Sequence, residues 1–355
     1  MPHPREPRLL DCGWRAVCRE TLAVTEGKEV ARMRIVTNTS WFEGRALNGV
    51  PFETRRISGS ALSGGIREFL RLRHWDAAIL NVAPWDVVAF CLLKRLFRSS
   101  RLKIVAIDLI LPPPRNLIQW IRVRLVAWLL HTVDLFIFYC KDTSRLQAVY
   151  GLPADRIRYV PFKVNEYHKV LSTPTSDAGY ILSCGRSFRD YATFCKALDG
   201  LPYRARILAT LDQLRENGTD LNLQSVPANI AVIAHDGASR SWIDAIACAT
   251  VVVLPISADA LVPAGISACL VAMALGKCVV VSDSPLTRGI LKDGEHAVVV
   301  PASDPAAMRA AIVRVSEDAD YRAHVARIGR EYALSLRDES RLGEDVVRET
   351  LNAIA

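Results

Sequence analysis

The stretch LVPAGISACLVAMALGKCVVVSD, residues 261–283, decides the fold of this chain. It begins as a loop, continues as an apolar run of helical length, turns at Gly276 and Lys277, and enters an apolar strand that ends in Ser-Asp. A strand with apolar residues at every position is buried on both faces, as in parallel sheets covered by helices. The stretch therefore predicts an α/β unit. From Leu261 to Val281 it contains no carboxylate.

The same alternation of apolar strands and helices fills residues 171–355. A polar, turn-rich segment, STPTSDAG at 172–179, separates it from an earlier series over residues 33–170. A chain of 355 residues is long for one domain and comfortable for two. We therefore predict two doubly wound, Rossmann-like domains that face each other across a cleft, where the carboxyl ends of strands from both can reach one ligand.

The first 32 residues and the cysteines indicate in which cellular environment this protein works. Residues 1–32 precede the first predicted strand and contain no apolar core of signal-peptide length, so we predict a poorly ordered extension or an upstream start. The nine cysteines form no C-x-x-C pair, which indicates neither a zinc site nor a disulfide framework. A reducing cytosol suits such a chain best.

Positive charge is concentrated in the first half of the chain. Residues 1–170 carry 27 Lys and Arg against 15 Asp and Glu, whereas residues 171–355 carry 18 against 22. This asymmetry predicts an anionic partner for the first half, namely a membrane surface, a phosphorylated acceptor or nucleic acid. A merely solvated basic face is the alternative.

One basic cluster stands close before a long apolar segment. Its members are Lys94, Arg95, Arg98 and Arg101, followed by LIQWIRVRLVAWLLHTV at 117–133. No uncharged apolar run reaches the ~18 residues that a membrane span needs. The segment is therefore predicted to be a core helix, with an interfacial role as the alternative, since basic clusters bind anionic lipid.

A candidate anion site follows the first strand of the second half. The turn CGRSFRDY at 184–191 opens a helix, so its backbone amides and the positive end of the helix dipole face the same point. Gly185, Arg186 and Arg189 form this turn, and an arginine fork suits phosphate. A capping network in which Arg186 pairs with Asp190 is the alternative.

Two later loops complete the predicted site. His235 is the second residue of AHDGASRSWIDAI, which follows a strand and could hold a nucleobase through backbone groups. The loop LPISADALVPAGIS leads to Gly265, which permits close approach of a ligand before a helix whose first amides are unpaired.

The order YVPF, GRSFRDY, AMALGKCVVVSDSP and ILKDGEHAVVVPASDPAAM resembles the GT-B glycosyltransferases, in particular the retaining glycosyltransferase family 4, also called group 1. The resemblance covers the second domain and, loosely, the first. It implies that Arg186 meets the donor diphosphate and that Arg189 stands near the place of the family's lysine. It also implies that the backbone at Ala264, Gly265, Ile266 and Ser267 cradles the donor.

The chain departs from the family pattern at two acids. The paired glutamates of the family, eight residues apart, would fall at Pro263 and Val271. Neither side chain accepts a hydrogen bond, so the contacts that these acids make to donor hydroxyls are lost or are supplied elsewhere.

The resemblance also assigns parts of the first domain. Its glycine-containing loop corresponds to NTSWFEGRALNG at 38–49, with Gly44 and Gly49. Asp108, at the end of VAIDLIL, takes the place of a family histidine near the donor sugar. A carboxylate there orients an acceptor hydroxyl or accepts its proton, and a turn-capping role is the alternative.

The sequence thus predicts a retaining glycosyltransferase that needs neither a metal nor a cofactor. Its partners would be a nucleotide sugar and a glycan or lipid-linked acceptor, without nucleic acid. We expect a cytoplasmic protein, peripheral at the inner face of the membrane. A catalytically silent GT-B protein that binds a nucleotide or a partner, and a sugar-nucleotide epimerase, are the alternatives.

Overall fold

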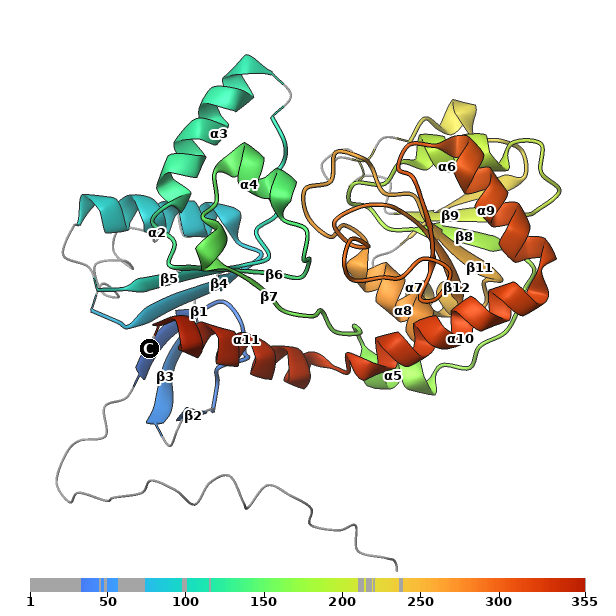
Figure 1. Cartoon of the computed structure of the whole chain (residues 1–355). Helices are drawn as coiled ribbons and strands as arrows, with labels where there is room; N and C mark the ends of the chain where they lie inside the picture. The colour runs from blue at the N-terminus through green and yellow to red at the C-terminus, as the bar shows by residue number, and fades with distance from the viewer. Residues whose placement is uncertain are drawn as a thin grey trace, which may run out of the picture.

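The computed structural model describes most of the chain after the predicted extension. The described residues are 33–44, 46–47, 50–56, 74–97, 101–114, 116–209, 214, 219, 221–235 and 239–354. Residues 1–32 therefore lie outside the described residues. Figure 1 shows two α/β units side by side, each built around its own sheet.

The first sheet contains seven described strands in the order β2-β3-β1-β4-β5-β6-β7. All neighbouring pairs are parallel except β2 and β3. The strands are β1 (Met33–Thr37), β2 (Ala46–Leu47), β3 (Val50–Arg56), β4 (Ala77–Asn81), β5 (Lys103–Ile107), β6 (Leu135–Phe138) and β7 (Ile157–Tyr159). The helices after them are α2 (Pro84–Leu96), α3 (Leu117–Leu130), α4 (Ser144–Tyr150) and α5 (Tyr167–Ser172), with a 3₁₀ turn at Ala154–Arg156.

The second sheet has the order β10-β9-β8-β11-β12-β13, and all its pairs are parallel. Its strands are β8 (Ile181–Cys184), β9 (Ala205–Ala209), β10 (Ile230–Ala234), β11 (Val251–Leu254), β12 (Cys278–Ser282) and β13 (Val298–Val300). Its helices are α6 (Tyr191–Leu198), α7 (Ser239–Ala247), α8 (Ile266–Ala274), α9 (Pro305–Glu317) and α10 (Ala319–Ser335), with a 3₁₀ turn at Leu223–Ser225. The last helix of the chain is α11 (Glu339–Ile354).

Burial explains why these strands are apolar throughout. Every residue of β11 and β12 is buried, and alternate residues of each strand enter two separate hydrophobic clusters, one on each face of the sheet. The first sheet likewise divides its buried residues between two clusters. Parallel sheets with both faces covered require this pattern. The predicted doubly wound α/β architecture is therefore confirmed.

The stretch 261–283 forms the centre of the second domain, as its composition predicts. Residues 268–274 of α8 are all buried, because α8 lies between the sheet and α10. Gly276, in the left-handed region at φ +72°, ends the helix, and β12 begins two residues later. A helix that is apolar on every side belongs in the interior of a domain.

The last helix returns to the first sheet, which no sequence pattern predicted. Figure 1 shows α11 running from the end of α10 to the first sheet, where it lies beside β1. Leu342 and Val346 of α11 are buried in one cluster with Trp41 and Phe42. Glu339, at the start of α11, accepts a hydrogen bond from the indole of Trp41 and pairs with Lys163. The boundary at residue 170 stays a prediction, but α11 packs against the first sheet.

Side chains also connect the two domains near their facing edges. Arg288 pairs with Asp283 of its own domain at 3.0 Å and with Asp142 of the first domain at 3.1 Å. Leu261, from the loop before α8, is buried in a hydrophobic cluster of the first domain. These contacts hold the loop before α8 against the first domain.

Among the described residues, every helix is too short or too polar to cross a membrane.

Removing the buried contact of α11 should destabilise the protein. Leu342→Ala removes a side chain that is 1% exposed and should lower the free energy of unfolding by about 2–5 kcal/mol, the usual cost of such a cavity. Urea unfolding followed by circular dichroism measures the change. The control is Leu223→Ala, at a leucine that is 57% exposed in the second domain. Equal unfolding midpoints for the two variants would contradict the packing of α11 on the first sheet.

Candidate functional site

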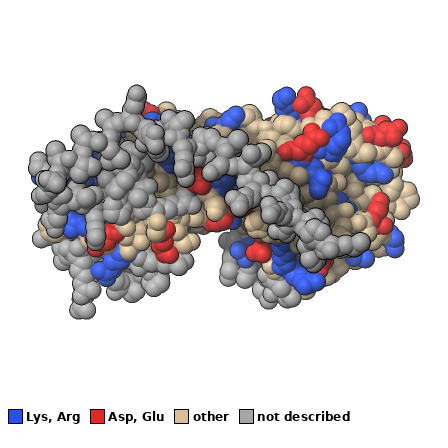
Figure 2. Space-filling model, turned by 90° about the horizontal axis from the view of Figure 1, so that it is seen from below, with Lys and Arg blue, Asp and Glu red and all other residues tan. Residues whose placement is uncertain are grey.

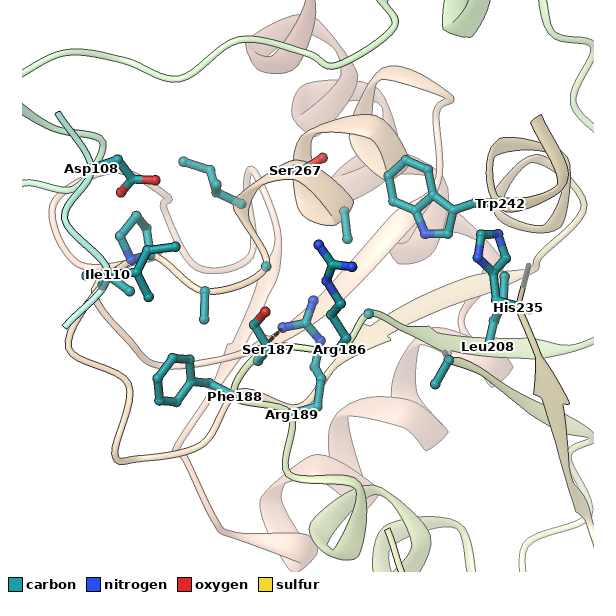
Figure 3. A pocket seen from close by; sticks show the side chains of 18 of the residues that line it. Asp108, Ile110, Arg186, Ser187, Phe188, Arg189, Leu208, His235, Trp242 and Ser267 are labelled. Atoms are coloured by element: carbon teal, nitrogen blue, oxygen red, sulfur yellow. Dashed lines mark hydrogen bonds between the residues drawn. The ribbon is translucent and has the colours of Figure 1, made fainter. Parts of the chain in front are cut away.

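One cavity of about 520 Å³ gathers most of the residues singled out from the sequence. Its lining comes from the turn after β8, the ends of β9 and β10, α7, the start of α8, and the segment after β5 in the first domain. Figure 3 shows Asp108 and Ile110 at one end and Trp242 and His235 at the other, with Arg186, Ser187 and Arg189 between them. The carboxyl ends of strands from both domains thus meet one cavity.

Three hydrogen bonds fix the turn after β8. Gly185 has φ +110°, a backbone conformation that favours glycine. Its carbonyl accepts a hydrogen bond of 2.6 Å from the hydroxyl of Tyr191. The hydroxyl of Thr219 accepts from the amide of Arg189 at 2.9 Å and donates to the carbonyl of Arg186 at 2.6 Å. The turn therefore holds one defined shape at the cavity wall.

Arg189 lies beneath this wall as a buried cation. The residue is 4% exposed, and its guanidinium donates to the carbonyls of Cys184 and Ser187, each at 2.9 Å. Among the described residues, no carboxylate pairs with it. A buried charge without a counter-charge is costly, and an anion in the cavity would reduce that cost.

Two glycines leave room for the buried guanidinium. A Cβ on Gly185 would overlap the guanidinium of Arg189, and a Cβ on Gly265 would lie 3.0 Å from one of its nitrogens and from Ile256. Both glycines have positive φ, at +110° and +86°. We predicted Gly265 from close approach of a ligand; in the structure, glycine at this position also leaves room for the side chain of Arg189.

Arg186 differs from Arg189 in its surroundings. Its side chain is exposed and points into the cavity (Figure 3). Asp190, the proposed alternative partner, caps α6: its carboxylate accepts from the amide of Thr193 at 3.0 Å, from the hydroxyl of Thr193 at 2.7 Å and from Ser303 at 3.0 Å. The carboxylate of Asp190 thus has a structural role.

The start of α8 supplies backbone donors, but not all of those expected. Gly265 is the N-cap of α8 in the left-handed conformation. The amides of Ala264 and Ile266 donate to the carbonyls of Val262 and Pro263, at 2.6 and 3.2 Å. Within the described part of the chain, the amides of Gly265, Ser267 and Ala268 at this helix start donate no backbone hydrogen bond. The amides of Ala264 and Ile266 are thus used within the loop, and binding of a donor by the backbone at this helix start stays a prediction.

Asn165 supports the helix start and was missed in the sequence. Its side-chain amide donates to the hydroxyl of Ser267 at 2.6 Å. The hydroxyl proton of Ser267 therefore remains able to donate to a ligand. Asn165 lies in the segment between the two domains, with no motif around it, so only the folded chain reveals its role.

The two positions where acids are missing have different environments. Pro263 lines the cavity, whereas Val271 is fully buried in the core of the second domain. Neither provides a polar side chain to the cavity. The wall at this end is formed instead by Val262, Pro263, Ala264 and Ile266.

Asp108 enters the cavity from the first domain. It follows β5 with φ +48°, a conformation that non-glycine residues rarely adopt, and its amide donates to the carbonyl of Ile137 at 2.8 Å. The residue is partly accessible, but its Oδ1 is buried and has no hydrogen-bond partner among the described residues. Burial raises the pKa of Asp108 to about 7. Among the described residues, no hydrogen bond of the Asp108 side chain supports the turn-capping alternative.

The far end of the cavity is aromatic. His235 follows β10 and shares a hydrogen bond of 3.3 Å with Ser241, and Trp242 of α7 lies beside it (Figure 3). Trp242 was not singled out in the sequence, because a tryptophan on a helix more often belongs to a core. Its flat ring, half-buried at the cavity wall, offers a stacking surface.

Other predicted residues lie elsewhere. Gly44 sits in the turn after β1 at φ +66° and does not line the cavity, and Gly49 lies outside the described residues. In the part of the chain that the structure describes, no three His, Cys, Asp or Glu side chains group as metal ligands do. Independence from metals stays a prediction.

The pKa of Asp108 predicts how stability depends on pH. Because its pKa is raised in the folded state, the carboxyl stays protonated there while it ionises in the unfolded chain. Stability should therefore fall as pH rises from about 4 to about 7. Asp108→Asn should remove this decline, as followed by urea unfolding across that range. The control is Asp259→Asn, at an exposed acid in the loop before α8. An unchanged pH profile in Asp108→Asn would show that Asp108 ionises normally.

Arg189 and Arg186 should respond differently to truncation. Arg189→Ala leaves two carbonyls without their donor and should lower the free energy of unfolding by about 2 kcal/mol or more. Arg186→Ala, at an exposed side chain, should leave it within about 0.5 kcal/mol. Thermal or urea unfolding measures both. Equal losses in the two variants would contradict the structural role of Arg189.

Comparison with known proteins agrees with this architecture. Residues 217–318 match a family model described as Glycosyl transferases group 1. No curated protein sequence matches the chain. Three similar solved structures are HepE of Anabaena in complex with UDP-glucose, sucrose-phosphate synthase of Thermosynechococcus elongatus, and a UDP-forming α,α-trehalose-phosphate synthase of Burkholderia vietnamiensis.

These structures resemble the chain over nearly its whole length. HepE has a TM-score of 0.65 at 13% identity and covers 90% of this chain and 100% of its own. The sucrose-phosphate synthase has a TM-score of 0.62 at 14% identity, covering 91% and 89%, and the trehalose-phosphate synthase has 0.56 at 12%, covering 92% and 100%. The chain therefore has the GT-B fold, and residues 217–318 of its second domain match the group 1 glycosyl transferase model.

Proposed function

We propose that this protein is a glycosyltransferase that moves a sugar from a nucleotide-sugar donor to a glycan or lipid-linked acceptor, with retention of configuration. One observation carries the proposal: the uncompensated cation of Arg189, the exposed Arg186 and the helix start at Gly265 surround the same cavity that Asp108 enters from the other domain. The match to group 1 glycosyl transferases over residues 217–318 supports it.

The donor diphosphate is placed between the turn after β8 and the start of α8. Arg186 binds it directly, since an arginine fork can hold two phosphate oxygens. Arg189 contributes its charge from beneath, and the amides of Gly265, Ser267 and Ala268 donate to the same anion. The nucleobase then lies toward Trp242 and His235. HepE of Anabaena, a structure of the same fold, was solved with UDP and with UDP-glucose.

The donor sugar then lies toward Asp108, at the end of the cavity formed by the first domain. In the transfer, the acceptor oxygen forms a bond to the anomeric carbon while the bond from that carbon to the diphosphate oxygen breaks. The acceptor proton passes to the Asp108 carboxylate or to the departing diphosphate. A pKa of about 7 suits this exchange, because a base acts best when its pKa lies near the working pH.

The absence of acids at Pro263 and Val271 changes how the donor is held. Backbone amides and arginines carry the diphosphate, and they can stabilise the charge that develops on it without a metal ion. The wall from Val262 to Ile266 provides apolar contact where the family pattern has an acid. A donor sugar with fewer hydroxyl groups on that side would fit such a wall best.

We propose that the acceptor lies at the inner face of the membrane. The excess of Lys and Arg in residues 1–170 supports an anionic surface for the first domain, whereas residues 171–355 carry slightly more acids than bases. Figure 2 shows acidic and basic side chains interspersed over the second domain in that view. We propose no nucleic-acid partner.

A catalytically silent GT-B protein is the second candidate. The missing acids and the buried Val271 favour it, because donor contacts typical of the family cannot be made there. A sugar-nucleotide epimerase has less support, since among the described residues of the lining Asp108 and His235 are the acid and the histidine available for acid and base chemistry. The two remaining classes differ in what they do after binding: a transferase consumes the donor and a silent protein does not.

Calorimetric titration with UDP, GDP and ADP and their sugar conjugates tests the proposal. One nucleoside diphosphate should bind, and Arg186→Ala should weaken its binding by about tenfold or more, the scale of one charge-assisted hydrogen bond. Arg327→Ala, at an exposed arginine of α10 that pairs with Glu331, is the control and should bind normally. The same samples are then incubated with the bound sugar nucleotide and an acceptor extract, and nucleotide release is measured. Binding without release would favour the silent protein, and no binding would reject both.

A further inference from the structure

Helix α3 is apolar on both of its sides, although only one side is buried. Val123, Val126, Ala127, Leu129 and Leu130 pack against the first domain. The opposite side exposes large apolar side chains at helical spacing: Leu117, Ile118, Ile121, Leu125 and Trp128. Leu117, Ile118 and Ile121 are 76%, 78% and 65% exposed. In Figure 1, α3 projects from the first domain.

The neighbouring helix extends the same surface. Trp85, Leu92 and Leu96 of α2 are also exposed, and α2 packs against α3. We call these residues together with the exposed side of α3 the α2–α3 face. An exposed apolar patch of this kind is uncommon on a protein surface and marks an interaction site.

The charges around the α2–α3 face are mostly positive, with Asp86 in the first turn of α2 as an acid beside Trp85. Helix α3 carries Arg122 and Arg124 and contains no carboxylate. Two tryptophans lie under cations: the guanidinium of Arg122 is 4.9 Å from the ring centre of Trp85, and that of Arg95 is 3.9 Å from that of Trp128. The face thus combines apolar side chains, tryptophans and arginines, which is the composition of helices at a membrane interface.

The basic cluster predicted from the sequence has a smaller part in this surface. Lys94 pairs with Asp134 at 2.7 Å, and Arg95 donates to Thr132 and to the carbonyl of Trp128. Arg101 is exposed, and Arg98 lies outside the described residues. Lys94 is therefore largely neutralised within the protein, and the apolar side of α3, which the cluster precedes, becomes the stronger candidate for contact.

We infer that the α2–α3 face lies in the interface of an anionic lipid bilayer, with α3 parallel to the membrane. A helix of 14 residues is too short to cross a bilayer, but it can bury one side among the acyl chains while Arg122 and Arg124 remain at the headgroups. Anionic lipid is favoured over a protein partner because the face offers cations without any acid on α3.

The face is connected to the cavity through a short segment. Asp108 and Ile110 line the cavity, and the chain then passes through Leu111–Pro114 to α3. The hydroxyl of Tyr150 fixes this segment by donating to the carbonyl of Pro112 at 2.7 Å. If the function proposed above is correct, an acceptor held in the bilayer would reach Asp108 along this side; the lipid contact itself does not depend on that function.

Sedimentation with lipid vesicles tests the inference. The vesicles are made of phosphatidylcholine alone or of phosphatidylcholine with phosphatidylglycerol. The full chain should bind the anionic vesicles more tightly, and added salt should weaken this binding. The double variant Ile118→Ser, Ile121→Ser should reduce binding by about tenfold or more, because two apolar side chains no longer enter the lipid. Leu223→Ser, at an exposed leucine of the second domain, is the control and should bind as the unaltered protein does.

A second pair of changes separates charge from apolar contact. Arg122→Gln with Arg124→Gln should weaken binding to anionic vesicles and leave binding to neutral vesicles unchanged. Equal binding of the unaltered protein and the Ile118, Ile121 double variant would overturn the inference. So would a protein that self-associates without lipid and becomes monomeric in that variant, since the face would then join two copies. Titration of each variant with nucleoside diphosphate is read separately, so loss of lipid binding and loss of the proposed function remain distinguishable.

Discussion

The cavity depends on one buried cation, the guanidinium of Arg189. By donating to the carbonyls of Cys184 and Ser187, it sets the shape of the turn that carries Arg186. It also requires glycine at 185 and leaves little room at 265, so both loops that face the cavity are shaped around it. The protein thus retains a costly buried charge at the point where two loops meet, which is reasonable if an anion occupies the cavity.

The second requirement is that the first domain reaches this cavity. The return of α11 to the first sheet, the Arg288 pairs with Asp142 and Asp283, and the insertion of Leu261 into the first domain hold the two halves in contact. Because of these contacts, Asp108 and Ile110 line a cavity otherwise formed by described residues of the second domain. A carboxyl with a pKa raised to about 7 is a consequence of that placement, since burial disfavours its charged form.

Two helices rich in apolar residues, α8 and α3, differ in how much of their surface is buried. Residues 268–274 of helix α8 are buried between its sheet and α10, whereas α3, which is also rich in apolar residues, has one exposed side. The hydrophobic effect stabilises α8 because the domain buries its apolar side chains. The exposed apolar side chains of α3 would gain the same stabilisation by contact with lipid or with a partner. The arginines beside the tryptophans indicate which of these partners suits it.

The sequence by itself determined the α/β class, the two doubly wound units and the grouping of Gly185, Arg186, Arg189 and Gly265, because strand burial and the glycine and arginine turns are local patterns. It did not reveal that α11 packs on the first sheet or that Asn165 donates a hydrogen bond to Ser267. Nor did it reveal that Trp242 lines the cavity or that one side of α3 is exposed. It also assigned Arg189 to a ligand without showing that its donors are directed to backbone carbonyls. Each of these depends on contacts between residues far apart in the chain, and a pattern within one segment carries no information about which distant surface will cover it.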